Sequence, residues 1–505
     1  MSSFSLLGLG IQGAQTNKTA LSVIGQNITN ANTEGYSRQE TNIVSISDLR
    51  GAQVASITRV TDQFLTQQMW SDTSSYNRAD AYATMASELD DRLATDSTSI
   101  STAMDNFFDS VQNVVDDPTS LPNRELFIAQ SEALVQRFND LASIIQRQQE
   151  SINSDLESYS TQITAYAQEV AQLNEEISLA DLAGENANEL RDQREQVLTN
   201  LSELIDIRTV EQDASQINVF VGNGEPLVIG QNSNAMESIH GDPDGTRQEL
   251  AVNVSGTLVN ITDFVSGGRL GGLLDYRSDV LNKAENELGR IAVAFADTMN
   301  DQHQKGMTLT DDLGGLLFTD VNSYEAITSR VSAKSDNNSS LETSTVRIKD
   351  ASALQASDYL VTFNSSSSFT VERISDGEVF RLSDLDSVAT EQDLIDQTNA
   401  YYLDENTGVA QIAIDGFQIN LDVNGKFFSG DEFHVQPSRY GAEQIGIQIT
   451  DGNDLAFASP IRTTASSSNT GSGSVDVVIT DINADTFQRT AGALNPPVEI
   501  VFSGT

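Results

Sequence analysis

The chain contains no cysteine, so it can form no disulfide, no thiolate nucleophile and no cysteine-based metal site. Histidine is scarce too: His240, His303 and His434 lie far apart, and none begins the His-Glu-x-x-His motif of zinc enzymes. No run of 18 apolar residues predicts a membrane-spanning helix. The start, Met1 to Leu7, lacks the charged end and continuous apolar core of a cleavable signal peptide. These features fit either a cytosolic protein or one that is exported unfolded without such a peptide.

Basic residues are few. The chain has 28 of them against 73 acidic residues, which gives a formal net charge of -45. Such a field repels the phosphates of nucleic acids and of anionic membranes, so neither is expected as a partner. Apolar residues make up 38% of the 505 residues and aromatic residues 6%. This length predicts roughly three domains, with packed but modest cores.

Residues 4 to about 31 are predicted to form an amphipathic helix whose apolar positions follow a seven-residue repeat. Lys18 and Gly25 interrupt this stripe, and a helix so narrow in its apolar face is marginal alone. We therefore expect it to be poorly packed or disordered in a lone molecule and to need a partner. Asn, Thr and Gly35 in residues 30–38 are expected to end the helix, and residues 43–57 are expected to be extended. The predicted stripe consists of Phe4, Leu7, Ile11, Ala14, Leu21 and Ile28.

Residues 61–206 are predicted to be almost entirely helical, with breaks at Pro118 to Pro122 and at Gly184. The strongest periodicity alternates steps of four and three, which is typical of a coiled-coil seam. Such a seam is buried either in the chain's own bundle or against another subunit. We favour the intramolecular bundle, because 86–115, 124–150 and 188–206 offer apolar faces. The seam consists of Ile152, Leu156, Tyr159, Ile163, Tyr166, Val170, Leu173, Ile177 and Ala180.

Period-two patterns follow in two places. Residues 208–262 predict a small β unit with a hairpin around Gly224, and a helix is expected again over about 270–302. Beyond 320, short β-branched runs predict an antiparallel β domain. The predicted fold is therefore multidomain α+β: an elongated helical bundle or coiled-coil core with inserted antiparallel β domains. Its expected parts are 1–57, an axial helix with an extended segment; 58–320, the helical core; 321–464, a β domain; and 465–505, a linker at 466–473 with an incomplete second β module.

The segment Ile28-Thr-Asn-Ala-Asn-Thr-Glu-Gly-Tyr-Ser-Arg-Gln39 resembles the Ala-Asn-x-x-Gly-Tyr signature of flagellar axial proteins. Its Gly-Tyr-Ser-Arg-Gln part is similar to the hook-associated protein 1 (FlgK) family. Further similarity, in the family's order, lies in Arg191 to Leu198, Gly267 to Asp275, Asn300-x-x-His303-x-x-Gly306, and Gly430 to Phe433 with Pro437. Glu34 departs from the proline that members often carry. Members also end in a helix that pairs with the first one, so the chain resembles a fragment that lacks this helix.

The resemblance implies a structural, non-enzymatic protein at the junction of the flagellar hook and filament, which supports filament assembly. It implies four partners: the hook protein, the next hook-associated junction protein, further copies of this chain in a ring, and an export chaperone in the cytoplasm. It also implies an extracellular location, reached by the flagellar type III route without a cleaved signal peptide. Besides the apolar stripe, we expect Asn32, Gly35, Tyr36 and Arg38 at the subunit interface, since an aromatic residue and an arginine are good anchors. The alternative for Tyr36 is packing on its own helix end.

The remaining motifs predict no catalytic, cofactor or metal site. Asp242 to Gly245 and Asp451 to Asp454 could bind calcium, but neither supplies a full ligand run, and Asp and Gly are good turn formers. The glycines of 267–272 lack the Lys-Ser/Thr of a phosphate loop and predict tight turns before a helix. Two further functions stay open: another axial part such as the hook protein, expected to be mostly β, and a secreted adhesin or enzyme using residues 321–505.

Overall fold

The computed structural model describes residues 3–46, 51–93, 99–212, 215–395 and 397–460. Their contacts form two compact units. Unit 1 comprises 1–88, 149–241 and 245–279, and unit 2 comprises 89–148, 242–244 and the residues from 280 onward. The expected linker and second β module at 465–505 lie outside the described residues. The four-part division made from composition stays a prediction.

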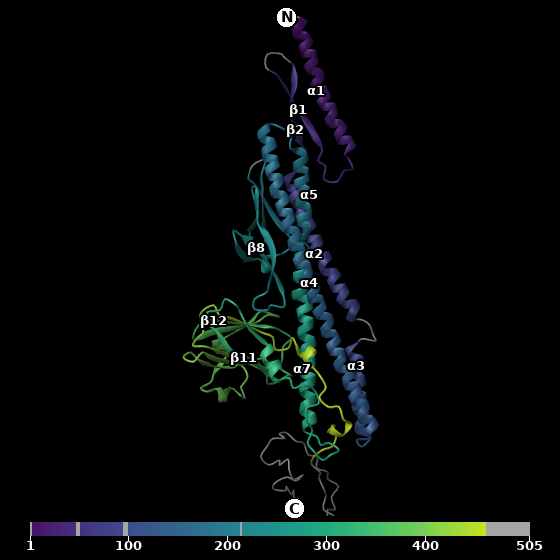
Figure 1. Ribbon diagram of the computed structural model, residues 1–505, viewed down its shortest axis with the longest axis vertical. Helices are drawn as coiled ribbons and strands as arrows, with labels where there is room; N and C mark the ends of the chain where they lie inside the picture. The colour runs from purple at the N-terminus through teal and green to yellow at the C-terminus, as the bar shows by residue number, and fades with distance from the viewer. Residues whose placement is uncertain (1–2, 47–50, 94–98, 213–214, 396, 461–505) are drawn as a thin grey trace, which may run out of the picture. The chain divides into compact units, whose positions relative to one another are not determined.

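The α+β character predicted from the sequence is confirmed (Figure 1). None of the described helices combines the length and the apolar character needed to cross a bilayer. The main helices are α1 (Ser3–Thr29), α2 (Gln63–Leu93), α3 (Ile100–Asp116), α4 (Leu121–Ala183), α5 (Asn188–Leu204), α6 (Gly268–Tyr276) and α7 (Asn282–Gln304), with a π-helical turn at Arg277–Leu281 and short helices α8 (Tyr324–Ser329) and α9 (Gly441–Gln444).

The structure has helix breaks at both predicted positions. α3 ends at Asp116, two residues before Pro118, and Pro122 occupies the first turn of α4, where its missing N–H costs nothing. α4 ends just before Gly184, whose φ of +75° is the left-handed conformation that glycine adopts readily.

The α4 seam forms the core of unit 1. Ile152, Leu156, Ile163, Val170 and Ile177 are fully buried, and Leu173 is nearly so. Tyr159, Tyr166 and Ala180 are half-buried. This burial within one unit confirms the intramolecular interpretation of the pattern. Of the three segments predicted to pack with the seam, 188–206 belongs to the same unit as the seam, whereas 89–115 and 124–148 belong to unit 2.

Two small antiparallel sheets also pack on α4, which the helical pattern did not indicate. The Asn174 side chain donates to the carbonyls of Ile217 (2.9 Å) and Gly230 (2.7 Å) and accepts from the Ile217 amide (3.2 Å). Thr164 exchanges hydrogen bonds with the Met236 backbone. The sheets have the orders β3-β4-β5-β6 and β7-β8-β9. Their strands are β3 (Ile207–Glu211), β4 (Ile217–Val221), β5 (Glu225–Ile229), β6 (Asn232–Ser233), β7 (Ala235–His240), β8 (Gln248–Val254) and β9 (Thr257–Asn260).

Gly268 and Gly272 lie in α6 and not in a turn before it, and both allow close backbone packing. A Cβ on Gly268, whose φ is +65°, would lie 2.2 Å from the carbonyl carbon of Leu204. A Cβ on Gly272 would lie 2.3 Å from the Arg78 carbonyl oxygen. Both positions therefore exclude any other residue without a backbone shift.

Unit 2 contains two five-stranded sheets that face each other across a shared apolar core. Their orders are β10-β19-β12-β13-β14 and β11-β18-β17-β16-β15. Alternate residues of β12 and of β18 are buried, as the period-two pattern predicts. The strands are β10 (Val331–Ala333), β11 (Leu341–Ile348), β12 (Tyr359–Ser365), β13 (Ser368–Arg373), β14 (Glu378–Arg381), β15 (Asp386–Ser387), β16 (Ala400–Asp404), β17 (Val409–Ile414), β18 (Phe417–Val423) and β19 (Glu432–Val435).

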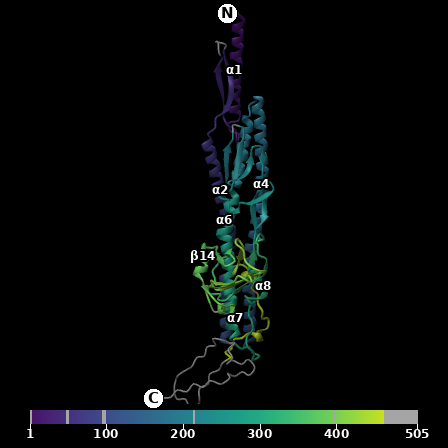
Figure 2. The ribbon, with the colours of Figure 1, turned by 90° about the vertical axis from the view of Figure 1, so that its left-hand side faces the viewer.

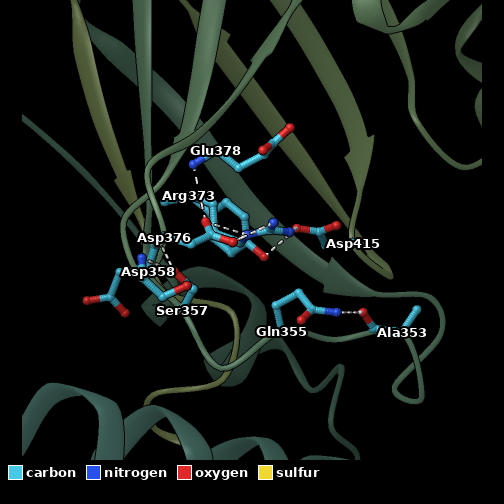
Figure 3. Close-up of polar contacts among 10 residues, drawn as sticks. Ala353, Gln355, Ser357, Asp358, Arg373, Asp376, Glu378 and Asp415 are labelled. Carbon is cyan, nitrogen blue, oxygen red and sulfur yellow. Dashed lines mark hydrogen bonds and ion pairs between the residues drawn. The ribbon is translucent and has the colours of Figure 1, made fainter. Parts of the chain in front are cut away.

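A polar cluster links the two sheets of unit 2 (Figure 3). Arg373 of β13 donates to Asp376 (2.9 Å) and to Asp415 (2.9 Å), which lies in the turn between β17 and β18. The Tyr359 hydroxyl of β12 donates to the same Asp415 oxygen at 2.7 Å. Burial and the negative charge of Asp415 both raise the pKa of Tyr359, so this hydroxyl stays protonated. Both carboxylates are paired with Arg373, which fits a structural clasp.

Asn300, His303 and Gly306, which carry one of the family resemblances, attach two loops to the end of α7. The Asn300 side chain accepts from the amides of Leu317 (2.9 Å) and Phe318 (2.8 Å). The ring of buried His303 contacts the Gly315 carbonyl (2.9 Å) and accepts from the Ala456 amide (2.9 Å). A Cβ on Gly306 would lie 2.4 Å from the Ala456 carbonyl oxygen. The spacing therefore has a structural explanation.

The Asp-rich turns are engaged in packing. Asp242 accepts from the amide of Ser335 at 2.9 Å, and Asp244 pairs with buried Arg439 at 2.7 Å. Asp451 accepts from the Asn453 amide at 2.8 Å. Within the described ranges, no group of three or more His, Cys, Asp or Glu side chains is arranged to hold a metal ion.

Candidate subunit interface

α1 packs in unit 1 through one narrow face. Only Thr16 and Val23 of its described side chains are buried. This face lies against the two-stranded antiparallel sheet of β1 (Gln39–Ser45) and β2 (Ala52–Arg59), which runs alongside α1 in both views (Figure 1, Figure 2). The Thr16 hydroxyl donates to the Ala52 carbonyl at 2.7 Å.

Asn27 fixes the other end of this contact. Its side chain donates to the Gln39 carbonyl (2.8 Å) and accepts from the Gln39 amide (2.9 Å). The same Asn27 oxygen accepts from the Tyr36 hydroxyl at 2.9 Å. Because it pairs with both backbone groups of Gln39, Asn27 occupies the place of a neighbouring strand at the start of β1.

The opposite face of α1 is apolar and exposed. The five large side chains on it have between 52% and 72% of their surface accessible. Ala14 is exposed as well. Fully burying a large apolar side chain contributes roughly 1.5–3 kcal/mol. The exposed side chains of α1 do not contribute this free energy in the lone chain. The five are Leu7, Ile11, Leu21, Ile24 and Ile28, whereas Leu9 lies on the hairpin side of the helix, near Gly51.

The signature segment after α1 turns the chain onto α5. Gly35 has a φ of +77°, and a Cβ there would lie 3.0 Å from the Gln196 side-chain oxygen. The following Ser37 amide donates to the carboxylate of Asp192 at 3.1 Å. The positive φ of Gly35 favours glycine, and the Gln196 side chain of α5 lies against this turn.

Arg59 and Asp192 are the electrostatic centre of this contact. The Arg59 Nε lies 2.8 Å from Asp192, and its Nη2 pairs with Glu195 and donates to the Ser37 hydroxyl at 3.2 Å. Both side chains of the Arg59–Asp192 pair are about nine-tenths buried, so solvent screens them little. Asn188, at the start of α5, donates to the Ile57 carbonyl of β2 at 3.0 Å.

Side chains of the Arg191 to Leu198 motif make contacts on two faces of α5. Asp192 meets the signature segment, whereas Arg194 donates to the Asn174 side chain of α4 (2.7 Å) and the Ser215 carbonyl (2.8 Å). Burial, assisted by the charge of Arg191, lowers the pKa of Arg194 to about 10, so it remains charged at neutral pH. The motif therefore joins the signature segment to the core of unit 1.

The residues predicted for the interface fall into three groups. Leu7, Ile11, Ala14, Leu21 and Ile28 lie on the exposed face of α1, while the Phe4 side chain lies outside the described residues. Asn32 and Arg38 have exposed side chains. Gly35 and Tyr36 take part in contacts within the chain. Their role between subunits stays a prediction, although Tyr36 does pack on the end of its own helix.

Sequence reasoning did not identify Thr16, Asn27, Arg59 and Asp192 as the residues that anchor this region. Asp192 lies in the Arg191 to Leu198 motif and Asn27 directly precedes the Ile28 to Gln39 signature. This proximity was the only indication in the sequence that they have a role. Arg59 follows an ordinary strand pattern, and its buried pairing depends on contacts between segments more than 130 residues apart.

The helical part of the chain matches a known family model. Residues 86–318 match the model described as the flagellar hook-associated protein FlgK helical domain. Flagellar hook-associated protein 1 of Salmonella typhimurium is 27% identical over 468 residues, covering 90% of this chain and 79% of that protein. The protein of the same name in Escherichia coli is 28% identical and is covered to 80%.

A solved structure agrees with these matches. The flagellar hook junction protein FlgK of Burkholderia pseudomallei superposes with a TM-score of 0.66 and 26% sequence identity. The superposition covers 77% of this chain and 66% of that one, slightly less than two thirds of its length. The fold, the ordered motifs and these likenesses together make the chain similar to the flagellar hook-associated protein 1 (FlgK) family.

Proposed function

We propose that this chain is a structural subunit of the bacterial flagellum that joins the hook to the filament and supports filament assembly. Similarity to the FlgK family supports this role, because the relatives are named for the hook-associated position. The observation that supports the proposal at the level of residues is the exposed apolar face of α1. The role requires no active site, and we propose none.

The apolar face supplies the binding free energy in this proposal. Leu21 and Ile28 are among its most exposed side chains, at 67% and 72%. Burying both against a neighbouring subunit removes their surface from water and orders a helix that has few contacts of its own. Assembly is then coupled to the ordering of α1.

The partners, the chaperone and the export route that we propose rest on the family resemblance. The neighbours of α1 are the hook protein, the next hook-associated junction protein and further copies of this chain. A cytoplasmic chaperone accompanies the chain before export, which follows the flagellar type III route without a cleaved signal peptide. Asn32 and Arg38, whose side chains are exposed beside the signature turn, contribute polar contacts to the same interface.

The mostly β hook protein is the weaker alternative. α2, α3, α4 and α5 occupy most of residues 63–204, which is the long helical stretch that a mostly β axial part would not have. We therefore keep the junction role.

Hook attachment by a doubly substituted chain tests the proposal. Leu21→Asp with Ile28→Asp is expected to weaken sedimentation with purified hooks by roughly 100-fold or more, since each buried side chain contributes about 1.5–3 kcal/mol. Leu182→Asp is the matched control, because Leu182 is 83% exposed near the C-terminal end of α4 and does not belong to the apolar face of α1. Undiminished attachment of the double variant, or of a chain without residues 1–40, contradicts the proposal.

A further inference from the structure

Unit 1 contains a partly open cavity of about 530 Å³ beside the start of α5. Its walls come from β2, the start of α2, the turn between α4 and α5, the first turns of α5, and the paired ends of β3 and β4. Small-molecule sites in proteins have volumes of roughly 300–1,000 Å³, so the cavity is large enough for a ligand. Three arginines line it, although the chain has only 28 basic residues against 73 acidic ones. They are Arg59, Arg191 and Arg194.

Arg59 and Arg191 already have carboxylate partners. The Arg191 Nη2 lies 2.7 Å from the carboxylate of Asp181 at the end of α4. Arg59 pairs with Asp192 and Glu195 of α5. The charges of these two arginines are therefore matched within unit 1, and neither is left for a ligand.

Arg194 differs from the other two arginines. It is only 4% exposed, and both of its hydrogen bonds to described residues start from Nη1 and end on neutral oxygens, those of the Asn174 side chain and the Ser215 carbonyl. Its Nε is buried and has no hydrogen-bond partner. Burial lowers the pKa of Arg194, and the nearby carboxylates of Glu211 and Glu195 offset this only in part. No carboxylate of the described residues forms an ion pair with Arg194, so its charge is unmatched at contact distance.

The unused edge of the Arg194 guanidinium is suited to a carboxylate. Nε and Nη2 lie on one edge of the planar group, and this edge can donate two parallel hydrogen bonds to one carboxylate. Leaving a buried N–H without an acceptor is unfavourable, and such groups are rare in folded proteins. An oxygen acceptor from outside the chain is therefore the expected partner of Nε.

The start of α5 adds a second attraction for an anion. The helix begins at Asn188, and its N-cap residue Ala187 makes no side-chain capping hydrogen bond. Both residues line the cavity, and the positive end of a helix dipole attracts negative charge. The exposed carboxylates of Glu185 and Glu211 also line the cavity and would repel a second negative charge on a ligand. Several neutral side chains there have hydrogen-bonding groups, namely Ser56, Thr58, Thr61, Gln63 and Asn186.

We propose that this cavity binds a small monocarboxylate with an uncharged, hydroxylated body. The carboxylate accepts from Nε and Nη2 of Arg194, and the hydroxyl groups bind the neutral polar side chains. A single negative charge matches the single unpaired arginine among the described residues that line the cavity. No residue of α1 lines it, so this site and the junction role are tested independently.

Titration of the full chain with sodium gluconate, followed by the NMR signals of the ligand at constant ionic strength, tests this inference. Gluconate is expected to bind saturably. Sorbitol, which has a CH₂OH group where gluconate has the carboxylate, is expected not to bind. Arg194→Met should abolish binding of gluconate, because it removes both donors of the guanidinium edge.

Asn186→Asp provides a second test that leaves Arg194 and its contacts in place. The Asn186 side chain accepts from the Asn188 amide at 3.1 Å, and an aspartate can do the same, so the start of α5 should be retained. The added negative charge in the cavity is expected to weaken gluconate binding by roughly tenfold. Asn424→Asp is the matched control, because it makes the same charge change at an exposed position in unit 2 and should bind gluconate as the unsubstituted chain does.

Three results overturn the inference: no saturable binding of gluconate, equal binding of sorbitol, and undiminished binding of gluconate by Asn186→Asp. Circular dichroism checks that each variant keeps its fold. If Arg194→Met does not fold, the comparison of Asn186→Asp with Asn424→Asp still decides the question.

Discussion

Buried arginines of this acidic protein bind backbone and amide oxygens as well as carboxylates. Arg124 is 1% exposed and donates to the carbonyls of Pro118, Gly452 and Leu455. Arg330 donates to the carbonyls of Val321 and Val346. Burial lowers the pKa of both, to about 10 for Arg330, so both stay charged at neutral pH. The planar guanidinium has five donors, which lets one side chain satisfy several loop carbonyls.

Replacement of Arg124 by methionine is expected to destabilise unit 2. The apolar chain fills similar volume but leaves three carbonyls without their donor, which costs about 3 kcal/mol in the free energy of unfolding. Urea unfolding followed by circular dichroism measures this loss. Arg290→Met, which breaks a part-exposed pair with Glu287 on α7, should cost less than about 1 kcal/mol. Equal losses in the two variants would show that the carbonyl contacts are unimportant.

His303 is expected to make stability depend on pH. Its ring accepts from the Ala456 amide, so it must be neutral, and burial, followed by the charge of Arg124, lowers its pKa despite the Gly315 hydrogen bond. The unfolded chain has the ordinary pKa of about 6.5 and therefore binds the proton first. The contribution of neutral His303 to the free energy of unfolding is fully present above about pH 6.5. It falls as the pH drops below this value, by up to about 1.4 kcal/mol per pH unit, until the pKa of His303 in the folded chain is reached.

Urea unfolding at about pH 7.5 and about pH 5.5 measures this dependence on either side of the ordinary histidine pKa. His303→Gln should lose part of the difference, because an amide does not titrate, whereas His240→Gln, at an exposed position, should retain it. The same difference in all three proteins would assign the effect to other groups.

At the scale of elements, α1 and α4 have similar apolar periodicities, but the apolar face is exposed in α1 and buried in α4. Ile163 and Val170 of α4 are fully covered, whereas Leu21 and Ile28 of α1 are exposed. α4 has two sheets and α5 to pack against, whereas α1 has a two-stranded sheet that touches its other face. A periodic pattern therefore predicts a helix and its apolar face but not what covers that face.

Hydrogen exchange is expected to distinguish these two helices. Amides of residues 4–31 in the monomeric chain should exchange much faster than those of 152–177, because opening α1 exposes few buried contacts. Mass spectrometry after brief labelling measures the difference. Protection of α1 equal to that of α4 would contradict the expectation that α1 is poorly packed when alone.

At the scale of the whole molecule, the net charge of -45 opposes the compact state. The chain is expected to gain on the order of 1 kcal/mol in the free energy of unfolding between low and physiological salt, because screening weakens self-repulsion. Trp70, the sole tryptophan, is buried in unit 1 and reports the transition by fluorescence. Sorbitol of equal osmolality is the control, and a gain as large in sorbitol would exclude screening.

Much of the fold could be predicted because its signals are local. Pro122 and Gly184 impose backbone conformations wherever they occur, and the seven-residue and two-residue periods follow from helix and strand geometry. The two sheets on α4 could not be predicted from its seam, because Asn174 and Thr164 look like ordinary polar helix positions. For the candidate site, the exposed stripe was predictable, whereas its anchors Asn27 and Asp192 were not.

By itself, the sequence determined the helices, the strands, the apolar stripe of α1 and the resemblance to the FlgK family, since each depends on residue order alone. The tertiary structure decided which stripe is covered and which is left for a partner. It also decided that Arg59 and Asp192 would share one nearly buried contact. Such pairings depend on chain segments far apart in sequence, whose approach is governed by the packing of the whole unit and not by any local pattern.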